Sequence, residues 1–402
     1  MARKLKSDKW LFAAAFFLVC VSVVMVYSAL AGRSIDAASA QLLARQATWA
    51  LLGGLLTVVV MRVDYRVWQH STVINAALGG VFAALMLLAL MKLAGLGHSV
   101  KGAVRWLGVG SVGIQPSEFA KLAVILFVAR LLSQRMDRVN DMRSVLVPVG
   151  GVLGAMALLI LYQPDLGTTI SICIVAFTML FAAGLSLQHL GLSALAAAPA
   201  VYLLVWTVPY RRARVLAFLD PWADPLGSGF QVIQSLIAVG TGGVFGRGLM
   251  EGVQKARFLP EPQTDFIYAV ISEETGLMGA TAVLLALLVI AWRGLRIAAN
   301  AQDRFGAFLA IGLTTMMAIQ GLINISVVLG LLPTTGQAQI GVLPIRPETF
   351  APTAPFFAGL KPVKTTATTV PTTAPRQTLA DMLADAPASK RQGLLLGHIR
   401  EV

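Results

Sequence analysis

The stretch WLFAAAFFLVCVSVVMVYSAL, residues 10–30, decides the fold class, because none of its side chains is charged. A helix of roughly 20 apolar residues crosses about 30 Å of hydrocarbon, so this stretch alone can span a membrane. Lys4, Lys6 and Lys9 precede it as in a signal peptide, but the apolar core of a signal peptide is shorter and further apolar runs follow here. We therefore expect a span that is kept in the protein.

The whole chain has the composition of a membrane protein. Of its 402 residues, 57% are hydrophobic and only 13% are charged, which is too few charges to coat a soluble globule of this size. Apolar runs between polar breaks predict about nine helical spans. They lie near residues 10–30, 47–61, 73–94, 118–132, 144–161, 169–187, 190–208, 267–292 and 306–331. The predicted fold is an all-α bundle of membrane helices.

The charges indicate how these spans are oriented. The chain has 32 Lys and Arg against 19 Asp and Glu, a net charge of +13, which in a soluble protein would suggest nucleic acid as a partner. Here the basic residues cluster in every second loop between the predicted spans. Short loops rich in Lys and Arg lie in the cytoplasm. We therefore expect no nucleic acid and a cytoplasmic N-terminus. Cys20 and Cys173 lie inside apolar runs, which indicates neither a disulfide framework nor a zinc site.

A long segment, residues 209–266, falls outside the cytoplasm in this orientation and is too rich in Gly, Pro and polar residues to be one more span. Its arginines, among them Arg211 and Arg214, suit an anionic lipid headgroup or a pyrophosphate, although a solvated basic loop explains them equally well. The run GTGGVFGRG, residues 240–248, could bring bare amides to a phosphate. Tight turns between short helices are the simpler interpretation, because no P-loop or dinucleotide motif is present.

Acidic residues at the mouth of the eighth predicted span, and inside it, are candidates for chemistry. Asp265 directly precedes the span, where it is either a helix N-cap, which is the simpler interpretation, or a general base or cation ligand. Glu273 and Glu274 lie about 12–13 Å further along the helix axis. Carboxylates at that depth are costly unless they face protein or water, so they either bond to neighbouring helices or line a functional site.

Other polar residues lie at helix ends or within spans. Glu118 and Lys121, three residues apart in the fourth span, could pair on one helix face. Asp165, in YQPDLGTT (162–169), is placed to cap the next span. Gln320 and Asn324 lie one turn apart in the ninth span, where polar side chains usually join helices and occasionally line a substrate cavity.

Five strings, in order along the chain, together resemble the SEDS (shape, elongation, division and sporulation) family, to which RodA, FtsW and SpoVE belong. They are KGAVRWLGVGSVGIQPSEFAKL (101–122), YQPDLGTT (162–169), RRARVLAFLDPWADPLGSGFQ (211–231), GTGGVFGRGLMEGVQKARFLPEPQTDFIYAVISEETGLMG (240–279) and QGLINISVVLGLLPTTG (320–336). The resemblance covers the chain from about residue 10 to residue 336 and leans toward the FtsW division type.

The resemblance implies a peptidoglycan glycosyltransferase that polymerises lipid II into glycan strands at the outer face of the cytoplasmic (inner) membrane during cell division or elongation. In the family, the aspartate that matches Asp265 is the essential carboxylate, so the resemblance favours catalysis over a helix cap. The candidates for holding the leaving pyrophosphate are Arg211, Arg214, Lys255 and Arg257. Residues expected to shape the substrate cavity are Glu118, Lys121, Asp165, Glu273, Gln320 and Asn324.

The resemblance also implies a cofactor and partners for the reaction. A divalent cation, Mg²⁺ or Mn²⁺, commonly supports it, and Asp265 could hold that ion. The expected partners are lipid II itself, a cognate class B penicillin-binding protein and other membrane proteins of the divisome or elongasome. Two alternatives stay open: a lipid II flippase, suggested by the intramembrane residues Glu273, Glu274 and Gln320, and an inactive scaffold that recruits a transpeptidase.

After Gly336 the chain departs from the family pattern, which continues into a tenth span. Residues 337–402 are rich in Thr, Pro and Ala, which is typical of disorder. We therefore expect a transmembrane domain, residues 1–336, followed by a disordered tail. The abrupt loss of motif and hydropathy suggests a reading-frame shift, and the missing span gives weight to the scaffold alternative. Translation of the other frames beyond the codon for Gly336 tests this hypothesis, and no span in any frame would refute it.

Overall fold

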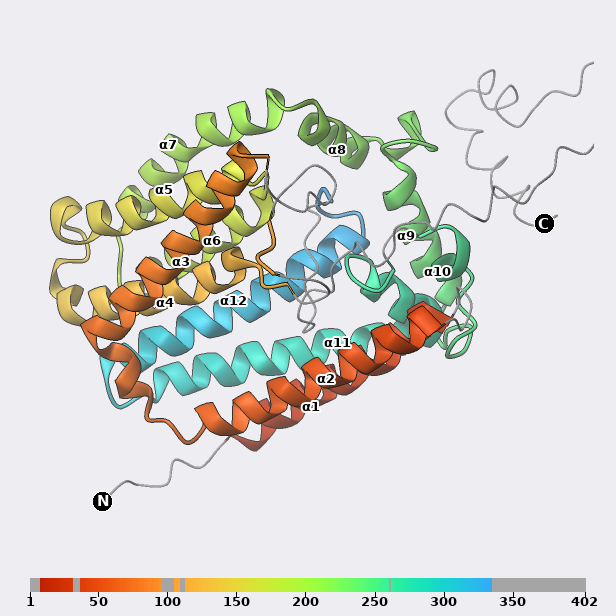
Figure 1. The fold of residues 1–402 in the computed structure, drawn as a ribbon, viewed down its shortest axis with the longest axis horizontal. Coiled ribbons are helices and arrows are strands. Elements are labelled where there is room, and N and C mark those ends of the chain that lie inside the picture. Colours follow the sequence, from red (N-terminus) through yellow and green to blue (C-terminus); the bar gives the residue numbers. More distant parts are fainter. Residues whose placement is uncertain (1–7, 32–36, 96–104, 109–112, 260–261, 335–402) are drawn as a thin grey trace, which may run out of the picture. The chain divides into compact units, whose positions relative to one another are not determined.

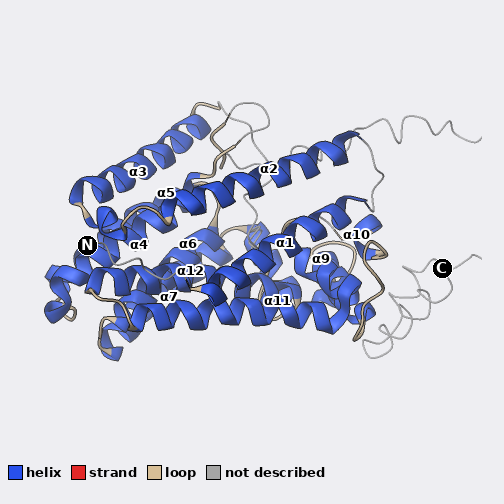
Figure 2. Ribbon diagram, turned by 90° about the horizontal axis from the view of Figure 1, so that it is seen from below, coloured by secondary structure: helices blue, strands red, loops and turns tan. Residues whose placement is uncertain are grey.

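The structure is a computed structural model, and it describes residues 8–31, 37–95, 105–108, 113–259 and 262–334 (Figure 1). Within these ranges the regular structure is helical, apart from one isolated bridge between Leu107 and Ile114. Figure 2 accordingly shows helices and loops, and no strand, in the described part of the chain. The predicted all-α fold class is confirmed. The predicted tail and its suspected frame shift lie outside the described residues.

Each of the predicted spans falls on a long helix. These helices are α1 (Lys9–Ala31), α2 (Ala37–Val60), α3 (Ser71–Leu93), α4 (Pro116–Arg135), α5 (Val147–Tyr162), α6 (Leu166–Ala182), α7 (Leu187–Trp206), α11 (Ile267–Ala299) and α12 (Arg304–Val328). Single turns lie at η1 (Tyr65–Gln69), η2 (Met136–Arg138), η3 (Met142–Leu146) and η4 (Pro221–Ala223).

By length and composition, 6 helices in the described ranges can cross a membrane: α1, α3, α5 with the preceding turn, α7, α11 and α12. The apolar part of α2 and the whole of α6 are shorter, and α4 carries charged residues such as Glu118, Lys121 and Arg130. The chain is therefore a multi-pass membrane protein, and the predicted number of about nine spans stays a prediction.

Helices α11 and α12 lie side by side in the middle of the bundle (Figure 1). Helix α11 also packs against α1, and α12 against α4 and α6. Glycines permit these close approaches: a Cβ atom at Gly294 would lie 2.0 Å from Thr314 Oγ1, and one at Gly321 would lie 2.7 Å from Leu287 Cδ1. Small residues at helix contacts are typical of membrane bundles, in which packing rather than water drives association.

Helix α7 differs from the rest because none of its residues is buried. Its main neighbours are α6 and α8, the helices that adjoin it in the chain. An apolar helix with so little protein cover needs an apolar environment, since in water its exposed apolar area would drive association. The exposed side of α7 is therefore suited to contact lipid or another membrane protein.

The described residues of the segment 209–266 form short helices rather than a further span, as predicted. They are α8 (Pro209–Leu219), α9 (Phe230–Gly242) and α10 (Gln254–Arg257). Between α8 and α9, the Asp224 carboxylate accepts hydrogen bonds from the amides of Ser228 (2.8 Å) and Gly227 (3.0 Å). The bonds from Ser228 hold the pKa of Asp224 below its ordinary value. This carboxylate fixes a turn of the segment.

Candidate active site

The described part of the bundle has a break in its longest helix. Gly276 in α11 has φ 65° and ψ −164°, a conformation that L side chains rarely adopt. Such a break deprives nearby backbone groups of their helical partners, and in a membrane these groups need others. The Gly-rich run provides them: Arg247 N–H to Glu273 O (3.0 Å), Gly248 N–H to Glu274 O (3.0 Å), Leu277 N–H to Gly243 O (2.9 Å) and Met278 N–H to Val244 O (3.3 Å).

The glycines of the run are required by this close approach. A Cβ atom at Gly276 would lie 2.3 Å from the amide nitrogen of Gly246, and one at Gly246 would lie 2.1 Å from the carbonyl oxygen of Glu274. A Cβ atom at Gly242 would lie 1.9 Å from the carbonyl oxygen of Ser272. The interpretation as tight turns between short helices is therefore supported, and the amides of Arg247 and Gly248 are used by α11.

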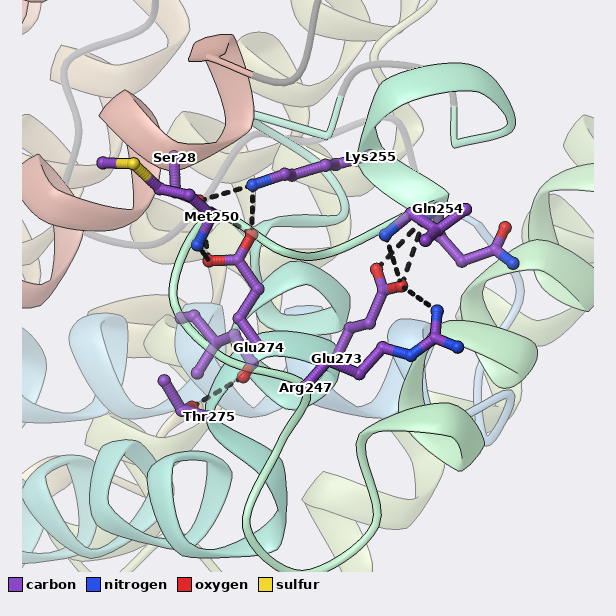
Figure 3. Close-up of polar contacts among 10 residues, drawn as sticks. Ser28, Arg247, Met250, Gln254, Lys255, Glu273, Glu274 and Thr275 are labelled. Carbon is purple, nitrogen blue, oxygen red and sulfur yellow. Dashed lines mark hydrogen bonds and ion pairs between the residues drawn. The ribbon is translucent and has the colours of Figure 1, made fainter.

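Glu273 is fully buried beside this break (Figure 3). Its Oε1 atom accepts hydrogen bonds from the amides of Val253 (2.7 Å) and Gln254 (3.2 Å), at the start of α10. The Arg247 guanidinium lies 3.7 Å from the same oxygen. Glu273 therefore fastens α10 to α11, which is one of the two roles that its sequence position suggested.

Glu274, also buried, has a different set of partners (Figure 3). Its carboxylate pairs with the Lys255 ammonium and accepts hydrogen bonds from Ser28 Oγ (2.6 and 2.7 Å) and the Met250 amide (3.0 Å). The Lys255 ammonium also donates to Ser28 Oγ at 2.7 Å. Helices α1, α10 and α11 thus meet at one buried ion pair.

Lys255 differs most from its expected role. We expected it to face a pyrophosphate, but its side chain has no exposed surface and its ammonium is bound to Glu274 and Ser28. A buried, paired ammonium cannot reach a phosphate without breaking this pair. In the structure Lys255 therefore has a structural role in the protein interior. Arg257 ends α10, and its side chain lies outside what the structure describes, so its phosphate role stays a prediction.

Asp265 lies in the turn before α11 and is half-buried. The N-cap position of α11 is occupied by Phe266, so Asp265 is not the N-cap residue that local sequence favoured. The Asn324 amide, from α12, donates to the backbone carbonyl of Asp265 at 2.9 Å. Asn324 is 4% exposed, and its Oδ1 atom has no hydrogen-bond partner among the described residues. Two predicted site residues are thus brought together, and Gln320 lies partly buried on the same helix.

A second polar cluster joins the starts of α4 and α6. Lys121 is buried and pairs with the partly exposed Glu118 at 2.8 Å, as predicted. Asp165 caps α6 by accepting from the Thr168 amide at 3.0 Å, and Gln115 donates to the same carboxylate at 3.3 Å. The starts of α4, α6 and α11 and the end of α12 point toward the same end of the bundle (Figure 1). The candidate residues therefore gather at the end that carries Asp265.

Arg211 and Arg214 lie on α8 and are partly exposed. The Arg211 guanidinium donates to the Leu204 carbonyl at 2.9 Å, and that of Arg214 donates to the Thr334 carbonyl at 2.9 Å. Arg214 also lies over the ring of Tyr210, 4.5 Å from its centroid. Both arginines contact their own chain here, and binding of a phosphate by either one stays a prediction.

These observations define a class of protein: a multi-pass α-helical membrane protein with a broken helix, buried carboxylates and a half-buried aspartate at one end. A family model described as "Cell cycle protein", which unites FtsW, RodA and SpoVE, matches residues 8–339, and the chain belongs to this family. The resemblance stated from the sequence strings is confirmed.

Curated relatives cover most of the chain. The probable peptidoglycan glycosyltransferase FtsW of Geobacter sulfurreducens is 43% identical over 329 residues, which are 81% of this chain and 86% of the relative. Stage V sporulation protein E of Bacillus subtilis (strain 168) is 42% identical over 337 residues, which are 83% of this chain and 90% of the relative.

Solved structures share the fold. A chain from work on the structural coordination of polymerization and crosslinking by a peptidoglycan synthase complex has a TM-score of 0.66 at 29% identity, covering 86% of this chain and 94% of that one. The rod shape determining protein RodA of Thermus thermophilus has a TM-score of 0.58 at 24% identity, covering 86% and 92%, and supports the fold alone.

Proposed function

We propose that this chain is a peptidoglycan glycosyltransferase that polymerises lipid II into glycan strands at the outer face of the cytoplasmic membrane. The observation that carries the proposal is the position of Asp265. Asp265 is half-buried in the turn that precedes α11, and Asn324 holds its backbone from α12. The FtsW of Geobacter sulfurreducens, named a probable peptidoglycan glycosyltransferase, matches 81% of this chain at 43% identity, which supports the same chemistry here.

In this reaction Asp265 acts as general base. Its carboxylate takes the proton of the acceptor sugar 4-hydroxyl while that oxygen attacks the anomeric carbon of the donor. The new glycosidic bond forms as the bond from that carbon to the pyrophosphate breaks, and undecaprenyl pyrophosphate leaves with the electron pair. The proton on Asp265 then passes to water, which restores the carboxylate.

The leaving pyrophosphate needs positive charge near it. We propose Arg211, Arg214 and Arg257 for this role and withdraw Lys255, whose ammonium is buried with Glu274. We propose further that Mg²⁺ or Mn²⁺ is held through Asp265 together with phosphate oxygens of the substrate. No group of three or more His, Cys, Asp or Glu in the described ranges could hold a metal ion alone. The oxygen donors Asp265 and Asn324 Oδ1 suit such a shared ion, which would neutralise charge on the leaving group.

The proposal extends to location and partners. We place the chain in the cytoplasmic (inner) membrane, with its N-terminus in the cytoplasm and residues 209–266 outside. A class B penicillin-binding protein is the expected partner, together with other divisome or elongasome membrane proteins. The similarity to a chain of a peptidoglycan synthase complex supports a partner of this kind.

The test is a polymerisation assay with the purified full-length chain and labelled lipid II, with and without the partner and the cation. Asp265→Asn should lower the rate at least about 100-fold, because a general base contributes that much or more. Glu251→Gln is the matched control, since Glu251 is an exposed carboxylate of the same segment, and it should retain the wild-type rate.

Other outcomes of the same assay would favour the alternatives. Intact polymerisation by Asp265→Asn would refute the catalytic assignment. Transport of lipid II across vesicle membranes, without any polymer from the wild-type chain, would favour the flippase. Co-purification with the penicillin-binding protein, with neither polymer nor transport, would favour the scaffold.

A further inference from the structure

Three buried polar side chains, Ser28, Lys255 and Glu274, join parts of the chain that are far apart in sequence (Figure 3). The ammonium of Lys255 contacts both other residues, and the Ser28 hydroxyl donates to the carboxylate. Ser28 belongs to α1 and is 246 residues from Glu274. We call these three residues the buried trio.

The buried trio fixes the start of α11, the helix that Asp265 precedes. Asp265 lies two residues before Ile267, where α11 begins, and Glu274 lies about two turns inside the helix. The pairing of Glu274 with Lys255 and Ser28 holds these first turns against α10 and α1. The Asn324 amide, from α12, binds the backbone carbonyl of Asp265. The turn that carries Asp265 is therefore held by α12 and leads into a helix that the trio fixes.

The charges of the buried trio are balanced, with one ammonium and one carboxylate. Removal of either charged side chain would leave the other buried without compensation, which endangers the fold as a whole. Ser28 can be changed without creating such a charge, because its hydroxyl is neutral. Ser28 is also the member on α1, so its loss separates this helix from the pair while the pair itself stays.

We propose that the buried trio positions Asp265 for the reaction and that Ser28, on the first helix, is a positioning residue of the active site. None of the three has to touch the substrate. The inference rests on the proposed function of Asp265 as general base. If the bonds of the trio loosen, α10 and the first turns of α11 gain freedom, and the carboxylate spends less time at the reacting hydroxyl.

The test uses Ser28→Ala in the full-length chain, with two measurements. The first is steady-state polymerisation of lipid II, in which kcat should fall about tenfold to 100-fold while KM stays constant, as expected when a reacting group is misplaced. The second is hydrogen–deuterium exchange without substrate. The amides of Met250, Val253 and Gln254, which donate to Glu273 and Glu274, should exchange faster than in the wild-type chain.

Ser22→Ala is the matched control, because Ser22 is a buried serine on the same helix whose partner is Gln46 on α2. It should leave kcat and the exchange of residues 250–259 unchanged. Exchange that does not rise in Ser28→Ala would overturn the proposal, and so would faster exchange with an unchanged kcat. A wild-type chain that makes no polymer would refute the proposed function and this inference together, whereas the first two outcomes refute the inference alone.

Discussion

Glu273 and Glu274 are adjacent in the chain, but neighbouring residues of a helix point about 100° apart, so they have different partners. Glu273 accepts from two backbone amides, and the Arg247 side chain, whose guanidinium lies 3.7 Å away, is 43% exposed. Glu274 neutralises the fully buried ammonium of Lys255. A neutral amide oxygen can replace the first carboxylate as an acceptor, but it cannot replace the second as a charge.

Substitution of the two glutamates should therefore have unequal effects. Glu273→Gln should cost about 1 kcal/mol, because its amide oxygen still accepts from the same backbone groups. Glu274→Gln should cost about 3–5 kcal/mol, because the Lys255 ammonium is left buried without a counter-charge. Thermal unfolding of the purified variants in one detergent measures both. Equal losses would mean that water or another group reaches Lys255.

At the residue scale, the sequence showed which buried side chains need a polar partner, but it did not show which residues these partners are. The cost of carboxylates in a membrane correctly indicated that Glu273 and Glu274 needed partners. The partners themselves could not be predicted. Ser28, for example, lies inside an uncharged apolar run with no local signal of a polar role. Lys255 was proposed for the pyrophosphate as a basic residue of the segment 209–266, while its actual partner, Glu274, lies on α11.

At the scale of elements, hydropathy was sufficient to place the long helices, because a span needs a long apolar run and little else. It did not reveal the break in α11. Gly276 follows the polar run Ser272 to Thr275 within the predicted span, and an isolated glycine in a helical pattern is common without any break. The matching signal was the glycine-rich run 240–248, which the structure packs against that break.

The break can be tested by adding one methyl group. Gly276→Ala should destabilise the protein by about 2–5 kcal/mol. The alanine would have to adopt a strained backbone conformation, and its Cβ atom would overlap the Gly246 amide. Gly53→Ala in α2 is the control, because nothing lies within 4 Å of its Cβ position. Its melting temperature should stay the same or rise. A tolerated Gly276→Ala would mean that α11 is continuous.

At the scale of the whole molecule, the orientation of the bundle decides whether Asp265 can meet a substrate outside the cell. Leu226 is 83% exposed in the segment 209–266, and Gln302 is exposed in the turn between α11 and α12, at the other end of α11. In a chain without Cys20 and Cys173, Leu226→Cys should react with a membrane-impermeant maleimide in intact spheroplasts. Gln302→Cys should react only after lysis. The reverse pattern would place Asp265 at the inner face.

The buried trio also bears on how the chain is made. Ser28 and Lys255 both precede Glu274, so the ribosome delivers the hydroxyl and the ammonium before the carboxylate emerges. A glutamate that enters the bilayer alone would be costly. Because Lys255 is synthesised first, its ammonium is available to pair with Glu274 as α11 is inserted, so this helix need not enter the lipid with an uncompensated charge.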